Sequence, residues 1–127
     1  MSLPKIVDVH VASLRGHGYA SLKAWLSVPG HVYLGRESPY VEGAVESKWA
    51  NPFAVNKYGL KRALDLFEQH LFDSGLIHDL EELKGTLEWG CWCVDLAVFD
   101  PTRPPRCHLE IILKYLFELV YEQRPTL

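Results

Sequence analysis

Residues 86–94 read TLEWGCWCV, and residues 108–123 read HLEIILKYLFELVYEQ. The first stretch is short and rich in aromatic and β-forming residues, which predicts a strand. The second has apolar residues at helical spacing and predicts the strongest helix of the chain. Its inward-facing positions are Leu109, Ile112, Leu113, Leu116, Leu119 and Val120. A strand followed by such a helix is a building unit of a layered α/β domain.

Two further strands are predicted before this unit. Residues 5–12, KIVDVHVA, alternate in polarity, and residues 31–35, HVYLG, form a short apolar run. Between them, Ser21 is placed to cap a short helix over LKAWL. Residues 36–59 show no sustained periodicity and predict a long loop, which in a small domain is often functional or mobile.

Helical spacing returns after this loop. It predicts one helix over residues 60–72 and a shorter one over 76–84, with Gly85 as the residue that ends it. Strands therefore alternate with helices along the chain. We expect a single domain over residues 1–127, an α/β layered sandwich with a partly parallel sheet.

Composition narrows the class of function. The chain has 127 residues, is 48% hydrophobic and carries a net charge of −3, which argues against extensive nucleic-acid binding. No apolar run approaches the roughly 20 residues that a membrane helix needs. The start of the chain lacks the features of a signal peptide, so we expect an intracellular, cytoplasmic protein. Nothing in the sequence indicates an oligomeric state.

The three cysteines all lie between positions 91 and 107. An odd number of cysteines in one short segment is not typical of a secreted protein held together by disulfides. It indicates metal ligands, reactive thiols or core residues. In a regular strand Cys91 and Cys93 share one face and are about 6.6 Å apart, which disfavours a shared zinc ion. A strand that ends near Cys91 would permit one.

Cys107 and His108 precede the strongest helix directly. Unpaired backbone N–H groups and the helix dipole stabilise a thiolate or a bound anion at such a position. We therefore expect Cys107 or Cys93 to be a reactive thiol, with His108 as the proton carrier. Glu110 lies in the first turn, where a carboxylate also suits the dipole and could contact a ligand.

Three hypotheses for this cluster stay open. One is a thiol-containing or anion-binding active site. The second is a structural zinc site with Cys91, Cys93, Cys107 and His108 as ligands, zinc being the one cofactor that the sequence suggests. The third is a non-catalytic interaction module in which the cysteines are simply packed.

The motifs around the cluster resemble those of an uncharacterised family catalogued as domain of unknown function 4326. They are Gly35-Arg36, SKWANPF at 47–53, GCWC at 90–93 and Cys107-His108, and the similarity spans residues 32 to about 120. The resemblance implies a shared site without naming an activity. A fainter similarity to another uncharacterised family, Rossmann-like and ending in a Cys-His pair, implies a Rossmann-like fold. Residues 37–46 and 94–106 are longer than the corresponding family loops, for a purpose that the sequence does not reveal.

The same motifs supply candidate neighbours for the cluster. Arg36 follows a predicted strand end, and Lys48 and Asn51 could join it in binding a small anionic ligand. Trp49 and Trp92 could stack on a base or sugar, which suggests a nucleotide-like ligand. The competing interpretation is that the cations are solvated and both tryptophans belong to the core.

His10 follows Asp8 on the polar face of the first predicted strand. It reaches the site only if that strand is central, and we expect it more often to be an ordinary solvated histidine.

Overall fold

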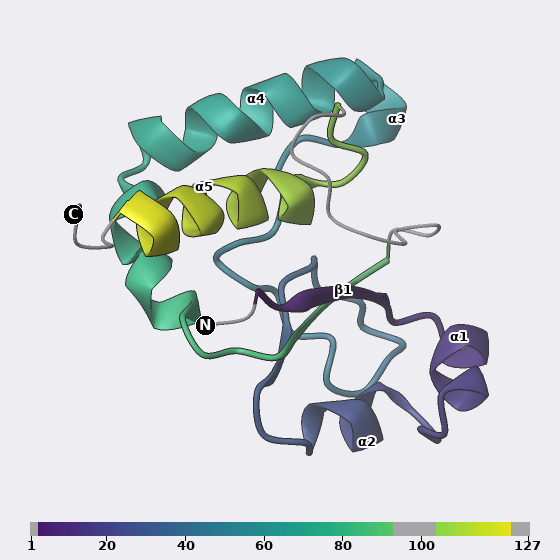
Figure 1. Cartoon of the computed structure of the whole chain (residues 1–127). Coiled ribbons are helices and arrows are strands. Elements are labelled where there is room, and N and C mark those ends of the chain that lie inside the picture. Colours follow the sequence, from purple (N-terminus) through teal and green to yellow (C-terminus); the bar gives the residue numbers. More distant parts are fainter. Residues whose placement is uncertain (1–2, 93–103, 123–127) are drawn as a thin grey trace.

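The computed structural model describes residues 3–92 and 104–122 (Figure 1). Its sheet has three strands in the order β1-β3-β2, and both pairings are parallel. The strands are β1 (Lys5–Asp8), β2 (His31–Tyr33) and β3 (Glu88–Cys91). The expected α/β class is therefore confirmed, and within the described residues the sheet is parallel throughout.

Helices lie on both sides of this sheet (Figure 1). Their bounds are α1 (Val11–Gly16), α2 (Leu22–Leu26), α3 (Val55–Tyr58), α4 (Leu60–Asp73), the 3-10 helix η1 (Leu76–Leu83) and α5 (His108–Glu122). The helices α4, η1 and α5 pack with one face of the sheet in a large apolar cluster, whereas α1 and α2 contribute to a smaller one.

The central strand β3 separates the two clusters by strict alternation of its side chains. Trp89 and Cys91 are buried in the large cluster. Gly90 faces the other way, where an added Cβ would lie 2.5 Å from Val9 and 2.9 Å from Trp25. A strand buried on both faces is typical of a parallel α/β sheet.

The connections between strands explain why both faces are covered. The chain passes from β1 through α1 and α2 to β2 on one side, and from β2 through α4 and η1 to β3 on the other. Of the adjacent strands β1 and β3, the first is followed along the chain by α1 on one face of the sheet and the second by α5 on the other. Their carboxyl ends form a topological switch point, the place where open α/β sheets commonly bind ligands.

Several predicted boundaries were wrong. The strand expected over residues 5–12 ends at Asp8, and α1 begins at Val11. The cause is local, because the Asp8 carboxylate accepts the His10 backbone N–H at 2.9 Å and turns the chain. The strand expected over 31–35 ends at Tyr33, and the loop expected over 36–59 contains the short helix α3.

Other predictions were confirmed. Ser21 caps α2 by accepting the Ala24 backbone N–H at 3.2 Å. The helix expected over 60–72 is α4, and the helix expected over 108–123 is α5. The segment over 76–84 is helical but of the 3-10 type, and Gly85 follows it with φ of +80°. The Rossmann-like arrangement stays a prediction.

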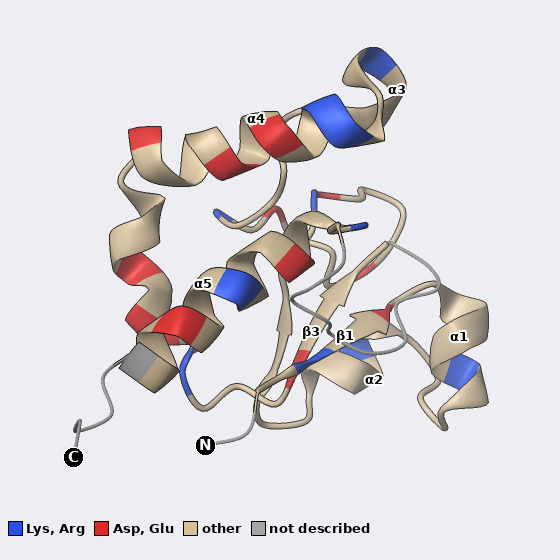
Figure 2. Ribbon diagram, turned by 45° about the horizontal axis from the view of Figure 1, so that its top comes forward, with Lys and Arg blue, Asp and Glu red and all other residues tan. Residues whose placement is uncertain are grey.

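The charged and apolar residues of the helices are distributed as expected for a chain of this composition. Figure 2 shows acidic and basic positions on both α4 and α5, so neither helix is basic along its length. None of the helices in the part of the chain that the structure describes has the length and apolar character of a bilayer span.

Gly90→Ala tests the packing of the central strand. The new methyl group would overlap Val9 and Trp25, and we expect the free energy of unfolding to fall by about 1–3 kcal/mol. Urea denaturation measures it. Gly16→Ala is the control, because nothing lies within 4 Å of a Cβ there. Equal stability of both variants and the wild type would show that this close contact is absent.

Candidate functional site

The candidate site lies at the carboxyl edge of the sheet. Parallel strands end at the same edge, which brings Asp8 of β1, Cys91 of β3 and Tyr33 of β2 to one side. The first residue of α5, His108, is hydrogen-bonded to Leu34, immediately after β2. Strand ends and a helix start therefore meet here, as the sequence predicted for Cys91 and Cys107-His108.

Cys107 stands directly before α5, with its sulfur facing the helix. The Leu109 backbone N–H donates to Cys107 Sγ at 3.5 Å. The carbonyl oxygen of Cys107 accepts the Glu110 backbone N–H at 3.0 Å, in the first turn. The sulfur thus occupies the position from which a side chain caps a helix, where partial positive charge favours a thiolate.

His108 is held in one tautomer by the backbone. Its Nε2 lies 3.0 Å from the Leu34 carbonyl oxygen, and a carbonyl only accepts, so Nε2 carries the proton. In the neutral ring Nδ1 is then the acceptor, and it lies 3.7 Å from Cys107 Sγ. The Phe67 ring packs edge-on against the imidazole at 5.1 Å. This geometry suits a proton carrier for Cys107.

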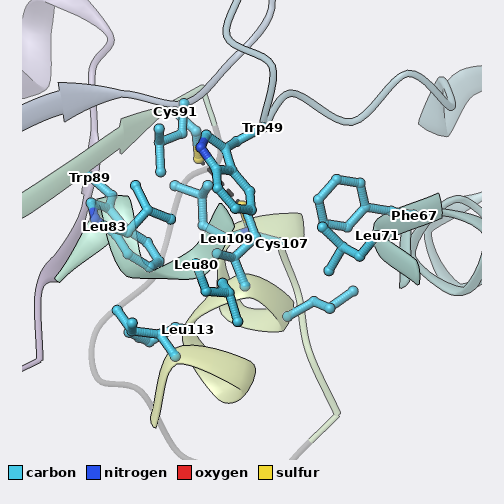
Figure 3. Packing of buried hydrophobic residues seen from close by; sticks show 14 of the residues in the cluster. Trp49, Phe67, Leu71, Leu80, Leu83, Trp89, Cys91, Cys107, Leu109 and Leu113 are labelled. Carbon is cyan, nitrogen blue, oxygen red and sulfur yellow. Dashed lines mark hydrogen bonds between the residues drawn. The ribbon is translucent and has the colours of Figure 1, made fainter. Parts of the chain in front are cut away.

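Cys91 completes a pair of sulfurs. Its Sγ lies 3.3 Å from that of Cys107, and the two residues are 2% and 1% exposed. Figure 3 shows them facing each other within the large cluster, beside Trp49. The expected convergence of strand end and helix start therefore holds for these two cysteines. Cys93, the third predicted member, lies outside the described residues.

The zinc hypothesis stays a prediction. Among residues 3–92 and 104–122, no group of three or more histidine, cysteine or acidic side chains is arranged to hold a metal ion. The predicted four-ligand set also needs Cys93. The packed-cysteine hypothesis likewise stays open, since Cys91 and Cys107 are buried yet lie beside polar atoms of His108 and Leu109.

Two residues predicted to contact the ligand, Lys48 and Trp49, form hydrogen bonds with η1. Lys48 Nζ donates to Asp79 at 3.1 Å and to Glu82 at 2.9 Å. These hydrogen bonds, Glu82 foremost, raise the pKa of Lys48. Trp49 is 2% exposed and donates its indole N–H to Glu82 at 2.9 Å. Both side chains therefore fasten the loop to η1, and the core interpretation holds for Trp49.

Asn51 and Glu110 also satisfy backbone groups. The Asn51 amide oxygen accepts the Phe53 N–H at 2.9 Å, which is the turn that Asn-Pro favours. Glu110 is 4% exposed, and its carboxylate accepts the Arg106 backbone N–H at 2.8 Å. The latter is a variant of the capping box, in which a carboxylate in the first turn satisfies a donor before the helix.

Arg36 and Trp92 follow β2 and β3 and lie at the carboxyl edge of the sheet. Arg36 is exposed, and its Nε donates to the Asn51 carbonyl oxygen at 2.7 Å. Trp92 donates its indole N–H to the Tyr33 hydroxyl, which in turn donates to the Arg36 carbonyl oxygen. Burial raises the pKa of Tyr33, so the hydroxyl keeps its proton. Gly35 admits this arrangement, because a Cβ there would lie 2.7 Å from the Tyr33 hydroxyl oxygen.

His10 lies at the same edge even though β1 is an outer strand and not the central one that the sequence argument required, because its ring reaches Trp92 after the neighbouring strand β3. Its Nδ1 lies 2.5 Å from an Asp8 carboxylate oxygen, and its ring packs edge-on against Trp92 at 5.0 Å. The side chain of His10 is 49% exposed. The sequence pattern that could have indicated this position is Asp-x-His at the end of a strand. That pattern does not show that β1 lies next to the central strand β3, which Trp92 directly follows.

Comparison with known proteins gives a family. The family described as "Domain of unknown function (DUF4326)" matches residues 20–118, which confirms the resemblance expected from the motifs. "Uncharacterized protein R718" of Acanthamoeba polyphaga mimivirus is 36% identical over 91 residues, covering 70% of this chain and 68% of the viral protein. No solved structure matches the chain.

Glu110→Ala tests the capping role. Loss of the acceptor leaves the Arg106 N–H without this bond, and we expect the free energy of unfolding to fall by about 1–2 kcal/mol in urea denaturation. Glu110→Gln keeps an acceptor oxygen and should retain most of the stability. Equal losses in the two variants would show that the negative charge itself is required.

Proposed function

The chain belongs to the DUF4326 family, and we propose that it binds a small phosphate-bearing ligand of the nucleotide class at the carboxyl edge of its sheet. The observation that carries this proposal is a series of contacts at this edge: the His10 and Trp92 rings pack together, and the Tyr33 hydroxyl joins the Trp92 indole to the Arg36 backbone carbonyl.

The topology supports the location. The described helix that follows β1 is α1 and the one that follows β3 is α5, and these two helices pack on opposite faces of the sheet. Residues that follow the strands can then contact a ligand from both sides. His10 and Trp92 follow β1 and β3, respectively, and their rings are in contact.

Arg36 is suited to the anionic part of the ligand. Its Nε is used by the Asn51 carbonyl oxygen, which orients the guanidinium, and no carboxylate among the described residues pairs with it. A guanidinium can bind two phosphate oxygens through parallel N–H groups. Lys48, in contrast, is already paired with Asp79 and Glu82.

Trp92 and His10 are suited to the remainder of the ligand. Trp92 is partly exposed, and its ring offers an apolar surface on which a base or sugar could stack. Since the Asp8 carboxylate accepts the proton of His10 Nδ1, the opposite nitrogen, Nε2, is the one that can accept a hydrogen bond or a proton from a ligand.

Titration calorimetry with AMP, adenosine and inorganic phosphate tests the proposal. We expect AMP to bind more tightly than adenosine, which lacks the phosphate. Arg36→Ala should weaken AMP about tenfold, or about 1.4 kcal/mol, and leave adenosine unchanged. This difference separates a phosphate contact from a general loss of structure.

Arg15→Ala is the matched control. Arg15 is also exposed and also donates its Nε to a backbone carbonyl, that of Ala20 at 3.4 Å, but it lies on α1 outside this group. The Arg15→Ala variant should bind AMP with the same affinity as the wild type. Failure of all three compounds to bind, or equal weakening of AMP and adenosine by Arg36→Ala, would refute the proposed site.

A further inference from the structure

We propose that Cys91 and Cys107 are a redox-active dithiol that a small hydroperoxide converts into a disulfide. The inference concerns the buried side of the strand end and does not depend on the ligand proposed for the exposed edge. It rests on the distance between the two sulfurs, on the polar atoms around Cys107 and on the elements that carry each residue.

The sulfurs are close enough to bond after a small movement. They are 3.3 Å apart, whereas a disulfide bond is about 2.05 Å long, so an approach of about 1.2 Å suffices. The residues are 16 positions apart in the chain, Cys91 at the end of β3 and Cys107 directly before α5. Their meeting is thus a product of the tertiary fold rather than of local sequence.

The surroundings make Cys107 the attacking sulfur. The Leu109 backbone N–H points at its Sγ from 3.5 Å, and the unprotonated Nδ1 of His108 lies 3.7 Å away. A donor of this kind at a helix start stabilises negative charge on sulfur, and the imidazole can take the thiol proton. Cys91, at 3.3 Å, is in place to resolve the oxidised sulfur.

The reaction balances with one hydroperoxide. The Cys107 thiolate attacks one oxygen of hydrogen peroxide, the O–O bond breaks, and the departing hydroxide takes the proton held by His108 to become water. Cys107 is then a sulfenic acid. The Cys91 sulfur attacks that sulfur, the S–O bond breaks, and the second hydroxide leaves as water with the Cys91 proton. Two electrons have passed from the two sulfurs to the peroxide oxygens.

Burial selects the class of oxidant. Cys91 is 2% and Cys107 is 1% exposed, so a large disulfide or a protein partner has no direct access to either sulfur. Hydrogen peroxide is close to water in size and can reach such sites through ordinary fluctuations of the fold. A dithiol at this depth should therefore discriminate between small and large oxidants.

Peptide mapping after hydrogen peroxide treatment tests the inference on the wild-type chain. The protein is treated while folded, then denatured, alkylated and digested. We expect the number of alkylated thiols to fall from three to one. The peptides containing Cys91 and Cys107 should be joined, with a mass lower by two hydrogens, and a reductant should restore all three thiols. Oxidised glutathione, the large oxidant, should react at least tenfold more slowly.

Cys93→Ser is the matched variant, because it removes the cysteine that the inference does not use. It should form the same bond at a similar rate, whereas Cys91→Ser and Cys107→Ser should not form it. Circular dichroism shows whether each variant folds like the wild type. If a variant does not fold, the peptide mapping of the wild-type chain still tests the inference.

Three results would overturn the inference. The first is retention of all three thiols after treatment. The second is a disulfide that involves Cys93. The third is stoichiometric zinc in protein purified without a chelator, since the sulfurs would then be metal ligands.

Discussion

A buried hydrogen bond from His108 Nε2 to the Leu34 carbonyl oxygen joins the start of α5 to the end of β2. That carbonyl lies just beyond the strand, and leaving it unpaired in the interior would cost about 1–3 kcal/mol. The bond also fixes the tautomer of the ring and directs Nδ1 toward Cys107. One contact thus satisfies the backbone, anchors the last helix and sets the chemistry available to the thiol.

The sequence was informative where a signal is local. Helical spacing located α4 and α5, and Ser21 located the start of α2, because propensity and capping act over a few residues. Cys91 and Cys107 were expected to meet because a strand end and a helix start share one edge of a parallel sheet. Their separation of 3.3 Å depends on tertiary packing, which no local pattern encodes.

Functional roles were harder to predict for the charged and polar residues. Lys48 is a suitable residue type for an anion, but its partners lie 31 and 34 positions later on η1. The sequence gives no means of seeing that η1 returns to this loop. For His10, the sequence missed a contact instead of overstating one. Its pairing with Asp8 is local, but its contact with Trp92 depends on β1 lying next to β3.

Strand alternation explains how one short motif serves both proposed sites. In β3, Gly90 leaves space for Trp25 on one face, and Cys91 points into the opposite cluster, where it meets Cys107. Trp92 then packs with the first face again, beside Tyr33 and His10. Consecutive side chains of a strand point to opposite sides, so the thiols are enclosed by apolar side chains while the neighbouring indole reaches the exposed edge. A shift of one residue in the register of β3 would exchange these environments, which is why the close packing at Gly90 matters for both sites.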